Sequence, residues 1–371
     1  MTDRAPTSCS FDETPLLHLR TVTDFVEAIP YLLGFHPTES LVVVMLHGPH
    51  DRVGVTLRYD LPEICGAPAM ARDVAAHASL HGADRAVVAV FAEHQPRADE
   101  VAEWPLVGQV SAALHQVGVA VADSLYVSGG SWRSYLCDDP ACCPSEGRPL
   151  PTPGTLSDLA VAAANAGLVA LPDRDALQAR LAPAEGSARA SMERALAAAE
   201  AAFVRAAASG GIPAWRAAMQ ARIERALTCT LAVGDGRGLS ALTHSGPLPL
   251  TDEEAAEILV ALSDTAVRDT WWLKAEDGGS SDALALWSGL VQRAVPPYDA
   301  APLFLLGWTA WRHGDGALAR MAAERALSSD PDYQAASLLL DAMDLSVDPR
   351  CLPSLAASMR GKESTTEGRE R

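Results

Sequence analysis

The chain has 371 residues, of which 49% are hydrophobic and 20% are charged, so it is long enough for two globular domains and too apolar to be largely disordered. Its formal net charge of -18 argues against nonspecific binding to nucleic acids or anionic lipids, because such binding needs Lys and Arg to neutralise phosphates. We therefore expect neither a nucleic acid nor a membrane as a partner.

The cellular location is predicted from the N-terminus and the cysteines. The opening residues, MTDRAPTSCSFDETP, contain no apolar core of signal-peptide length, and the longest apolar stretches, such as Leu41–Leu46, are too short to span a bilayer. The seven cysteines are an odd number in a long chain, which fits reduced thiols better than a disulfide framework. These features predict a cytoplasmic protein.

Hydrophobic patterning predicts a helix and a β-hairpin near the start of the chain. Thr23 is a candidate N-cap for the helix, and Pro30 should kink or break it because proline lacks the backbone N–H. Ser40–His47 (SLVVVMLH) is a continuous apolar run, typical of a strand buried on both faces. Arg52–Leu61 alternates apolar residues with polar or small ones, which predicts a second, half-buried strand after a turn.

Two further helices and three further strands are predicted before the chain changes character. Pro105 should separate the first turn of the second of these helices from the rest. The order of elements, β-β-α-β-α-β-β, predicts an α/β domain with a mixed sheet. In chain order the additional elements cover Ala69–His81, Arg85–Ala92, Asp99–Val117, Val119–Val127 and Trp132–Cys137.

A segment rich in Pro, Cys and Gly, Asp138–Gly154, is the predicted joint between two domains, because strand patterns vanish beyond it. Thr155 with Asp158, and Thr251 with Glu254, have the spacing of capping boxes that begin helices. The remainder therefore reads as an all-α domain. The predicted organisation is a flexible arm at residues 1–20, an α/β domain at 21–150, a helical domain at 155–360 and a disordered tail at 361–371.

A helical-repeat pattern occurs near the end of the chain. Residues 300–333 resemble one tetratricopeptide unit, although no second unit is as clear. Small residues in such a unit allow close approach of two helices. One reading is a helical hairpin that packs on the preceding helices, and the alternative is a peptide-binding groove. The matching positions are Leu306, Gly307, Gly314, Ala319, Ala326 and Pro331.

Several segments together resemble a known family. The residues that carry the resemblance are PYLLGFHPTES at 30–40, followed by LVVVMLHG and RYDLP, then WRSYLC, CCPSEGRPL and VRDTWW. With the tetratricopeptide-like tail, the chain from about 23 to 350 is similar to the actinobacterial family known as domain of unknown function 4192. The resemblance implies a cytoplasmic protein of high-GC Gram-positive bacteria with no established activity. It therefore transfers no catalytic residue to this chain.

The first candidate site is the loop that leads into the Ser40–His47 strand. His36, Glu39 and Ser40 offer proton-transfer or hydrogen-bonding groups, and loops at sheet ends are where ligand sites collect. Ser40 and His36 do not make a catalytic triad, and no G-x-S-x-G elbow accompanies them. The alternative interpretation is a turn whose polar side chains cap backbone groups.

The second candidate site is Arg58 with Asp60 at the end of the hairpin. Side chains alternate along a strand, so these two should point to the same face. They could bind an anionic ligand, or they could form an ion pair at the sheet edge.

The third candidate site is the cysteine cluster Cys137, Cys142 and Cys143. Clustered thiols in a reducing compartment suggest zinc binding or redox chemistry, yet the paired C-x2-C spacing of a zinc knuckle is absent. Adjacent cysteines are awkward simultaneous ligands, so a structural loop is the third alternative. A fourth ligand would have to come from elsewhere, with His36, His47 and Cys65 as candidates.

Two other segments are interpreted structurally. Gly234–Gly238 lacks the spacing of a dinucleotide loop and a Walker lysine, which indicates a flexible turn. Trp271 and Trp272 lie on a predicted helix and point about 100° apart, so one should pack inward and one should lie at an interface.

These observations leave three classes of function open. The one we favour is a non-enzymatic regulatory protein that binds a protein partner or a small ligand, with the helical domain as a scaffold. The second is a hydrolase-type enzyme with its site at the sheet edge, using His36, Ser40, Arg58 and Asp60. The third is a zinc or thiol module at the cysteine cluster, which makes zinc the one candidate cofactor.

Overall fold

A computed structural model describes most of the chain. The described residues are 19–62, 66–93, 104–152, 154–155, 157–166, 168–233, 250–276 and 281–345, with 347, 349 and 352. Residues 1–18 of the predicted arm, the predicted tail, Cys65 and the Gly234–Gly238 turn lie outside these ranges. Among the described helices, none is both long enough and apolar enough to cross a membrane.

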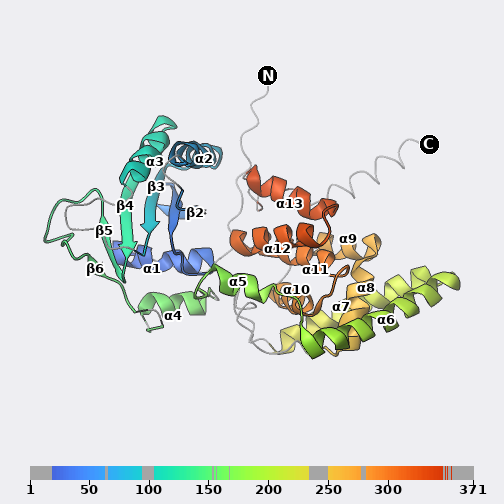
Figure 1. The fold of residues 1–371 in the computed structure, drawn as a ribbon. Coiled ribbons are helices and arrows are strands. Elements are labelled where there is room, and N and C mark those ends of the chain that lie inside the picture. Colours follow the sequence, from blue (N-terminus) through green and yellow to red (C-terminus); the bar gives the residue numbers. More distant parts are fainter. Residues whose placement is uncertain are drawn as a thin grey trace, which may run out of the picture. The chain divides into compact units, whose positions relative to one another are not determined.

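The described chain divides into two compact units (Figure 1). The α/β unit comprises the described residues up to Ala163, together with Ala170–Arg174. The helical unit comprises Ala164–Val169 and the described residues from Asp175 onward. The predicted fold class, a mixed-sheet α/β region followed by a helical region, is confirmed. The cysteine-containing segment Asp138–Gly154, the predicted joint, falls inside the α/β unit.

The α/β unit contains a six-stranded sheet in the order β2-β1-β3-β4-β5-β6. Within this sheet β3 and β4 pair in parallel, and the other neighbouring strands are antiparallel. Sequence patterns predict the first five strands, whereas the two-residue strand β6 has no pattern of its own. The strands are β1 (Ser40–His47), β2 (Arg52–Asp60), β3 (Arg85–Phe91), β4 (Ala120–Ser128), β5 (Ser131–Ser134) and β6 (Arg148–Pro149).

Helices cover the sheet because its central strands are apolar on both faces. One face of β1, with Leu41, Val43 and Met45, joins a core that includes residues of α2 (Ala67–Leu80) and α3 (Trp104–Gln116). These two helices lie side by side (Figure 1). The other face includes Trp132 of β5, whose Nε1 donates a hydrogen bond of 3.0 Å to Thr23 Oγ1 of α1 (Val22–Leu33). Helices therefore contact both faces of the sheet, α2 and α3 on one face and α1 on the other.

Helix α1 differs from the prediction in its cap and its continuity. Thr21, not Thr23, is the N-cap, because Thr21 Oγ1 accepts from Asp24 N and Asp24 Oδ2 accepts from Thr21 N. Pro30 does not break the helix, which continues to Leu33. Pro30 is buried, so its apolar packing offsets the lost backbone hydrogen bond, and only one more turn follows before Gly34 ends the helix in the left-handed region (φ 79°).

The other predicted helix starts agree in part with the structure. Pro105 lies in the first turn of α3, where proline is tolerated, so no separate turn precedes it within the described residues. Thr251 and Glu254 form the predicted capping box. Helix α4 (Asp158–Asn165) is instead capped by Ser157, whose Oγ accepts from Ala160 N, because Thr155 uses its hydroxyl on Thr152 O.

The helical unit consists of packed helices in its described part. Its elements are α5 (Arg174–Arg180), α6 (Gly186–Ala208), α7 (Ile212–Val233), α8 (Asp252–Leu262), α9 (Thr265–Glu276), α10 (Ser281–Arg293), α11 (Ala300–Arg312), α12 (Gly316–Ser329) and α13 (Gln334–Asp344).

Helices α11 and α12 form the hairpin where the tetratricopeptide-like pattern occurs. Every residue of α11 from Ala300 to Trp311 is buried, so this helix is surrounded by its neighbours and does not line an open groove. Gly307 permits the close approach, since a Cβ placed on it would lie 3.0 Å from Ala319 O and 3.2 Å from Leu339 Cδ2. The hairpin is therefore built for packing, and its membership of the tetratricopeptide class remains a prediction.

We predict that Gly307→Val lowers the free energy of unfolding by about 1–3 kcal/mol, because the added side chain meets a backbone oxygen that cannot rotate away. Gly108→Val is the matched control, since Gly108 lies within α3 and nothing lies within 4 Å of its Cβ position. Urea unfolding of both variants and the wild type measures the difference. Equal midpoints for the two variants would contradict the packing argument.

Candidate functional site

The first two candidate sites meet at one edge of the sheet. Ser40, at the start of β1, pairs with Asp60 on one side and with Phe91 on the other. The loop before β1 is held by a short parallel bridge, in which His36 N donates to Leu171 O at 2.9 Å and Leu171 N donates to Gly34 O at 2.8 Å. The ends of three strands therefore lie together at this edge.

Ser40 is fully buried and its hydroxyl is used twice. Its Oγ donates to Thr38 O at 2.6 Å and accepts from Arg58 Nε at 2.9 Å. Arg58 Nη2 also forms an ion pair with Asp60 Oδ1 at 2.5 Å. Arg58 and Asp60 thus point to the same face, as strand alternation predicts. The Ser40 hydroxyl thus donates to a carbonyl and accepts from a guanidinium, and within the described residues it has no hydrogen bond to a base of the kind that activates a nucleophilic serine.

Glu39 joins the neighbouring chain segments at the same edge. Its carboxylate Oε1 accepts from Glu93 N at 2.7 Å, beyond the end of β3, and its carbonyl accepts from Leu61 N at 2.9 Å, beyond β2. Its backbone has φ 43°, a left-handed conformation that costs a non-glycine residue energy. These bonds offset that cost. Glu39 therefore closes the loop rather than facing a ligand.

His36 is half-buried, and this burial lowers the pKa of its imidazole, which favours the neutral ring. Among the described residues, no hydrogen bond joins the His36 ring to Ser40 or Arg58. The structure brings together Ser40, Arg58 and Asp60 in one network and leaves His36 out of it. The geometry of this edge matches the turn-and-ion-pair interpretation of its sequence.

The three cysteines lie on the thiol loop, residues 135–147, which connects β5 to β6. Antiparallel pairing of Trp132 with Arg148 and of Ser131 with Pro149 holds both ends of the loop. Gly147, just before β6, has φ 82°, and a Cβ there would lie 2.9 Å from Ser131 Oγ. Only glycine allows the returning chain to pass so close to β5.

A tight turn inside the thiol loop directs Cys142 and Cys143 back toward Cys137. The carbonyl oxygen of Asp139 accepts from Cys142 N at 3.0 Å and from Cys143 N at 2.7 Å, while its carboxylate Oδ1 accepts from Ala141 N at 2.9 Å. Asp139 thereby supplies acceptors for three successive turn amides. The turn is fixed by hydrogen bonds that do not involve the sulfurs.

Two arginines attach the thiol loop to the sheet. Arg148 of β6 donates from Nε to Cys142 O and from Nη2 to Ala141 O, the latter at 3.3 Å. Arg133 of β5 donates from Nη1 to Ser145 O at 3.1 Å. Both guanidinium groups therefore lie beside the loop and hold its backbone carbonyl oxygens.

The three sulfur atoms of the thiol loop form a compact group. The Sγ atoms of Cys137, Cys142 and Cys143 all lie within 4.8 Å of one another. Cys142 is exposed, while Cys137 and Cys143 are half-buried. The pKa of the Cys143 thiol is raised to about 11, chiefly by burial and also by the two neighbouring thiols, while a backbone hydrogen bond from Ser134 lowers it in part. Adjacent cysteines are thus compatible with one shared site here.

The fourth ligand considered from the sequence does not join this group. Among the described residues, neither His36 nor His47 belongs to the sulfur cluster, and no carboxylate does. The third candidate, Cys65, lies outside the described residues.

A small cavity lies beside the thiol loop. Its volume of about 30 Å³ has room for one or two waters and not for a substrate. The Ser128 Oγ is buried there without a hydrogen-bond partner within the described structure. The cavity is lined by Tyr126, Ser128, Ser131, Trp132, Arg133, Ser145 and Glu146.

The tryptophan pair of α9 belongs to an aromatic core in the helical unit. Trp271 packs against Trp287 with ring centres 6.4 Å apart, and Trp272 packs against Phe304 and Trp308 at 5.1 and 5.4 Å. Trp271 is buried and Trp272 is half-buried at the contact between α9 and α11, which agrees with the prediction that one packs inward and one lies at an interface.

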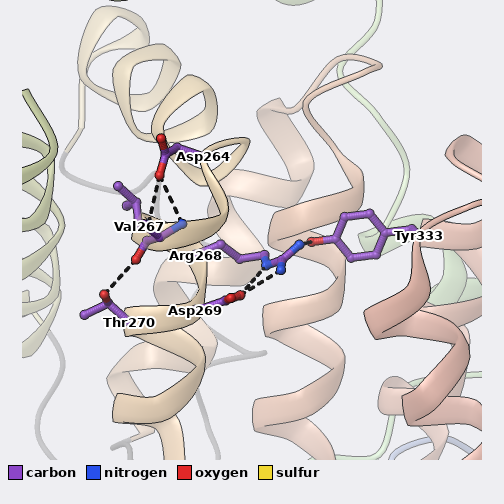
Figure 2. A network of polar contacts seen from close by, with 7 residues as sticks. Asp264, Val267, Arg268, Asp269, Thr270 and Tyr333 are labelled. Carbon is purple, nitrogen blue, oxygen red and sulfur yellow. Dashed lines mark hydrogen bonds and ion pairs between the residues drawn. The ribbon is translucent and has the colours of Figure 1, made fainter. Parts of the chain in front are cut away.

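Arg268, three residues before this pair, is held in a polar network of the helical unit (Figure 2). It donates to Asp269 Oδ1 from Nε at 2.8 Å and from Nη2 at 2.7 Å, and Nη1 reaches Tyr333 Oη at 3.2 Å. Burial raises the pKa of Tyr333, so the phenol stays protonated at neutral pH. The network joins α9 to the start of α13 and serves packing.

The comparisons with known proteins identify the family. A family model described as a domain of unknown function (DUF4192) matches residues 23–350. The chain belongs to this family. No curated protein and no solved structure matches the chain. The DUF4192 region spans both units, and every candidate residue from His36 to Cys143 lies within it.

We predict that Ser40→Ala lowers the free energy of unfolding by about 1–3 kcal/mol, because it leaves the half-buried Arg58 Nε without its acceptor. In Ser40→Ala/Arg58→Met both partners are absent, so the loss should be smaller than the sum of the two single losses. Chemical denaturation of the four proteins in a double-mutant cycle measures this coupling. Strictly additive losses would contradict a structural role for the pair.

Proposed function

We propose that this DUF4192 protein is a non-enzymatic regulatory protein whose small-ligand site is the thiol loop. The observation that carries the proposal is the convergence of three sulfur atoms within 4.8 Å on a loop fixed by other groups. Such a group of thiols can bind a ligand or be oxidised, and neither process requires a catalytic residue. The hydrogen bonds of Asp139 and Arg148 position the loop before any ligand arrives.

The sheet edge supports the non-enzymatic part of the proposal. The hydrolase alternative needs a free Ser40 hydroxyl with a base in reach, but this hydroxyl is buried and bonded to Thr38 O and to Arg58. Glu39 is likewise committed to backbone amides. The edge therefore holds strand ends together, and the regulatory reading is the better fit.

The helical unit, in this proposal, is a scaffold and the part that contacts a protein partner. The tetratricopeptide-like hairpin at 300–333 supports the scaffold part of this role, since it packs against its neighbouring helices. The buried α11 gives the scaffold a rigid centre. The proposal also places the protein in the cytoplasm of an actinobacterium, which is supported by the odd number of cysteines and by the residues of the family resemblance.

The test is whether the thiol loop responds to a metal ion that binds thiols or to a reagent that oxidises them. Wild-type protein is exposed separately to zinc chloride and to a hydroperoxide, and hydrogen exchange of residues 135–147 is measured. We expect at least one treatment to slow amide exchange in the loop, because cross-linking the sulfurs restrains the Asp139 turn.

The variant Cys137→Ser/Cys142→Ser/Cys143→Ser should show no such response. Cys229→Ser is the matched control, since Cys229 is a free, exposed cysteine on α7 of the helical unit. It should respond as the wild type does. A wild-type loop that exchanges equally fast with and without both reagents would contradict the proposed function.

A further inference from the structure

We propose that the thiol loop is a zinc site in which Cys137, Cys142 and Cys143 bind one Zn²⁺ and the fourth coordination position stays open. This inference rests on the proposed function and names the ligand of its site. It commits to a metal ion rather than to a disulfide.

The separation of the sulfurs suits a single zinc ion. Zinc binds thiolates at about 2.3 Å in a tetrahedral arrangement, which sets sulfur–sulfur distances of about 3.8 Å. The three sulfurs lie within 4.8 Å of one another. Side-chain rotations that shorten the sulfur–sulfur distances by about 1 Å therefore bring them to the separation that one zinc ion needs. A disulfide, by contrast, joins two sulfurs at about 2.0 Å and leaves the third without a role.

The backbone of the loop explains how two adjacent cysteines can share one ion. The amides of Cys142 and Cys143 both donate to the carbonyl of Asp139, so the chain is curled where the two side chains leave it. The Arg148 guanidinium donates to the Cys142 carbonyl and thereby holds this part of the loop. The curl brings both sulfurs to the side on which Cys137 lies.

The chemistry of the donors selects the metal. Three sulfur ligands favour soft or borderline ions such as Zn²⁺ over Mg²⁺ and Ca²⁺, which need oxygen ligands. Three thiolates with one Zn²⁺ carry a net charge of -1, and Arg133 and Arg148 lie beside the loop to offset it. The site is therefore matched to a divalent thiophilic cation in both hardness and charge.

The open position follows from the number and exposure of the ligands. Within the described chain, no histidine or carboxylate joins the three sulfurs, and Cys142 is exposed to solvent. Zinc with three protein ligands takes water or an incoming donor as its fourth. An imidazole or thiolate donor from solution could therefore replace the water, which makes the site able to sense such a donor.

The experiment is a metal titration of the full chain, purified reduced and metal-free. Zn²⁺ affinity is measured by competition with a chelating dye, and Co²⁺ serves as a spectroscopic substitute. We expect one ion per chain, with thiolate-to-cobalt charge-transfer absorption and the visible bands of tetrahedral cobalt. Adding imidazole should shift the visible bands without removing the metal.

Variants assign the ligands. Cys142→Ser should weaken Zn²⁺ binding by more than about 100-fold, beyond the loss expected for an outer partner, and it should leave the fold intact because Cys142 is exposed. Cys137→Ser and Cys143→Ser should behave alike, while Cys229→Ser should bind as the wild type does. Circular dichroism of the metal-free variants checks their folding.

The outcomes separate this inference from the function on which it rests. One outcome is that no stoichiometric Zn²⁺ binds, while a hydroperoxide oxidises two of these thiols to a disulfide and is itself reduced to an alcohol and water. In that case the zinc site is wrong and the proposal of a regulatory thiol loop stands. If neither reaction occurs, both are wrong. A cobalt spectrum that imidazole leaves unchanged would overturn the open position.

Discussion

The pairing of β6 with β5 is the constraint on which the candidate site depends. Two residue pairs, Ser131 with Pro149 and Trp132 with Arg148, close the ends of the thiol loop. Closure places the Arg148 side chain against the loop carbonyls. Without these pairs the Asp139 turn would no longer be anchored to the sheet at both ends of the loop, and ordering the loop around a ligand would cost more conformational entropy. The short strand therefore converts three nearby cysteines into one site.

The sheet edge and the thiol loop use polar residues in opposite ways. At the edge, Ser40, Arg58 and Glu39 use their polar groups on strand ends and neighbouring loops, and a strained Glu39 backbone is the cost. In the thiol loop the backbone is held by Asp139 and the arginines, so the sulfurs are left available. The presence of reactive residue types is thus a poor indicator of a functional site. A better indicator is whether their polar groups are already used in hydrogen bonds within the fold.

Much of the fold could be predicted because the spacing of hydrophobic residues along the chain indicates strands and helices directly. The run Ser40–His47 and the alternation in Arg52–Leu61 identify β1 and β2. Strand β6 could not be found, since two residues carry no period and their pairing is non-local. The N-cap of α1 is Thr21 rather than the predicted Thr23, and the T-x-x-D spacing of Thr21 with Asp24 is the sequence signal that indicates it. The cysteine cluster was visible in the sequence, but the Asp139 turn that gathers its sulfurs was not.

The most direct measurement of the central claim is X-ray absorption at the zinc edge on the full-length, zinc-loaded protein. A site built by Cys137, Cys142 and Cys143 predicts three sulfur scatterers at about 2.3 Å and one oxygen or nitrogen at about 2.0–2.1 Å. A shell made only of oxygen and nitrogen would contradict the account. A shell of four sulfurs would contradict the open position.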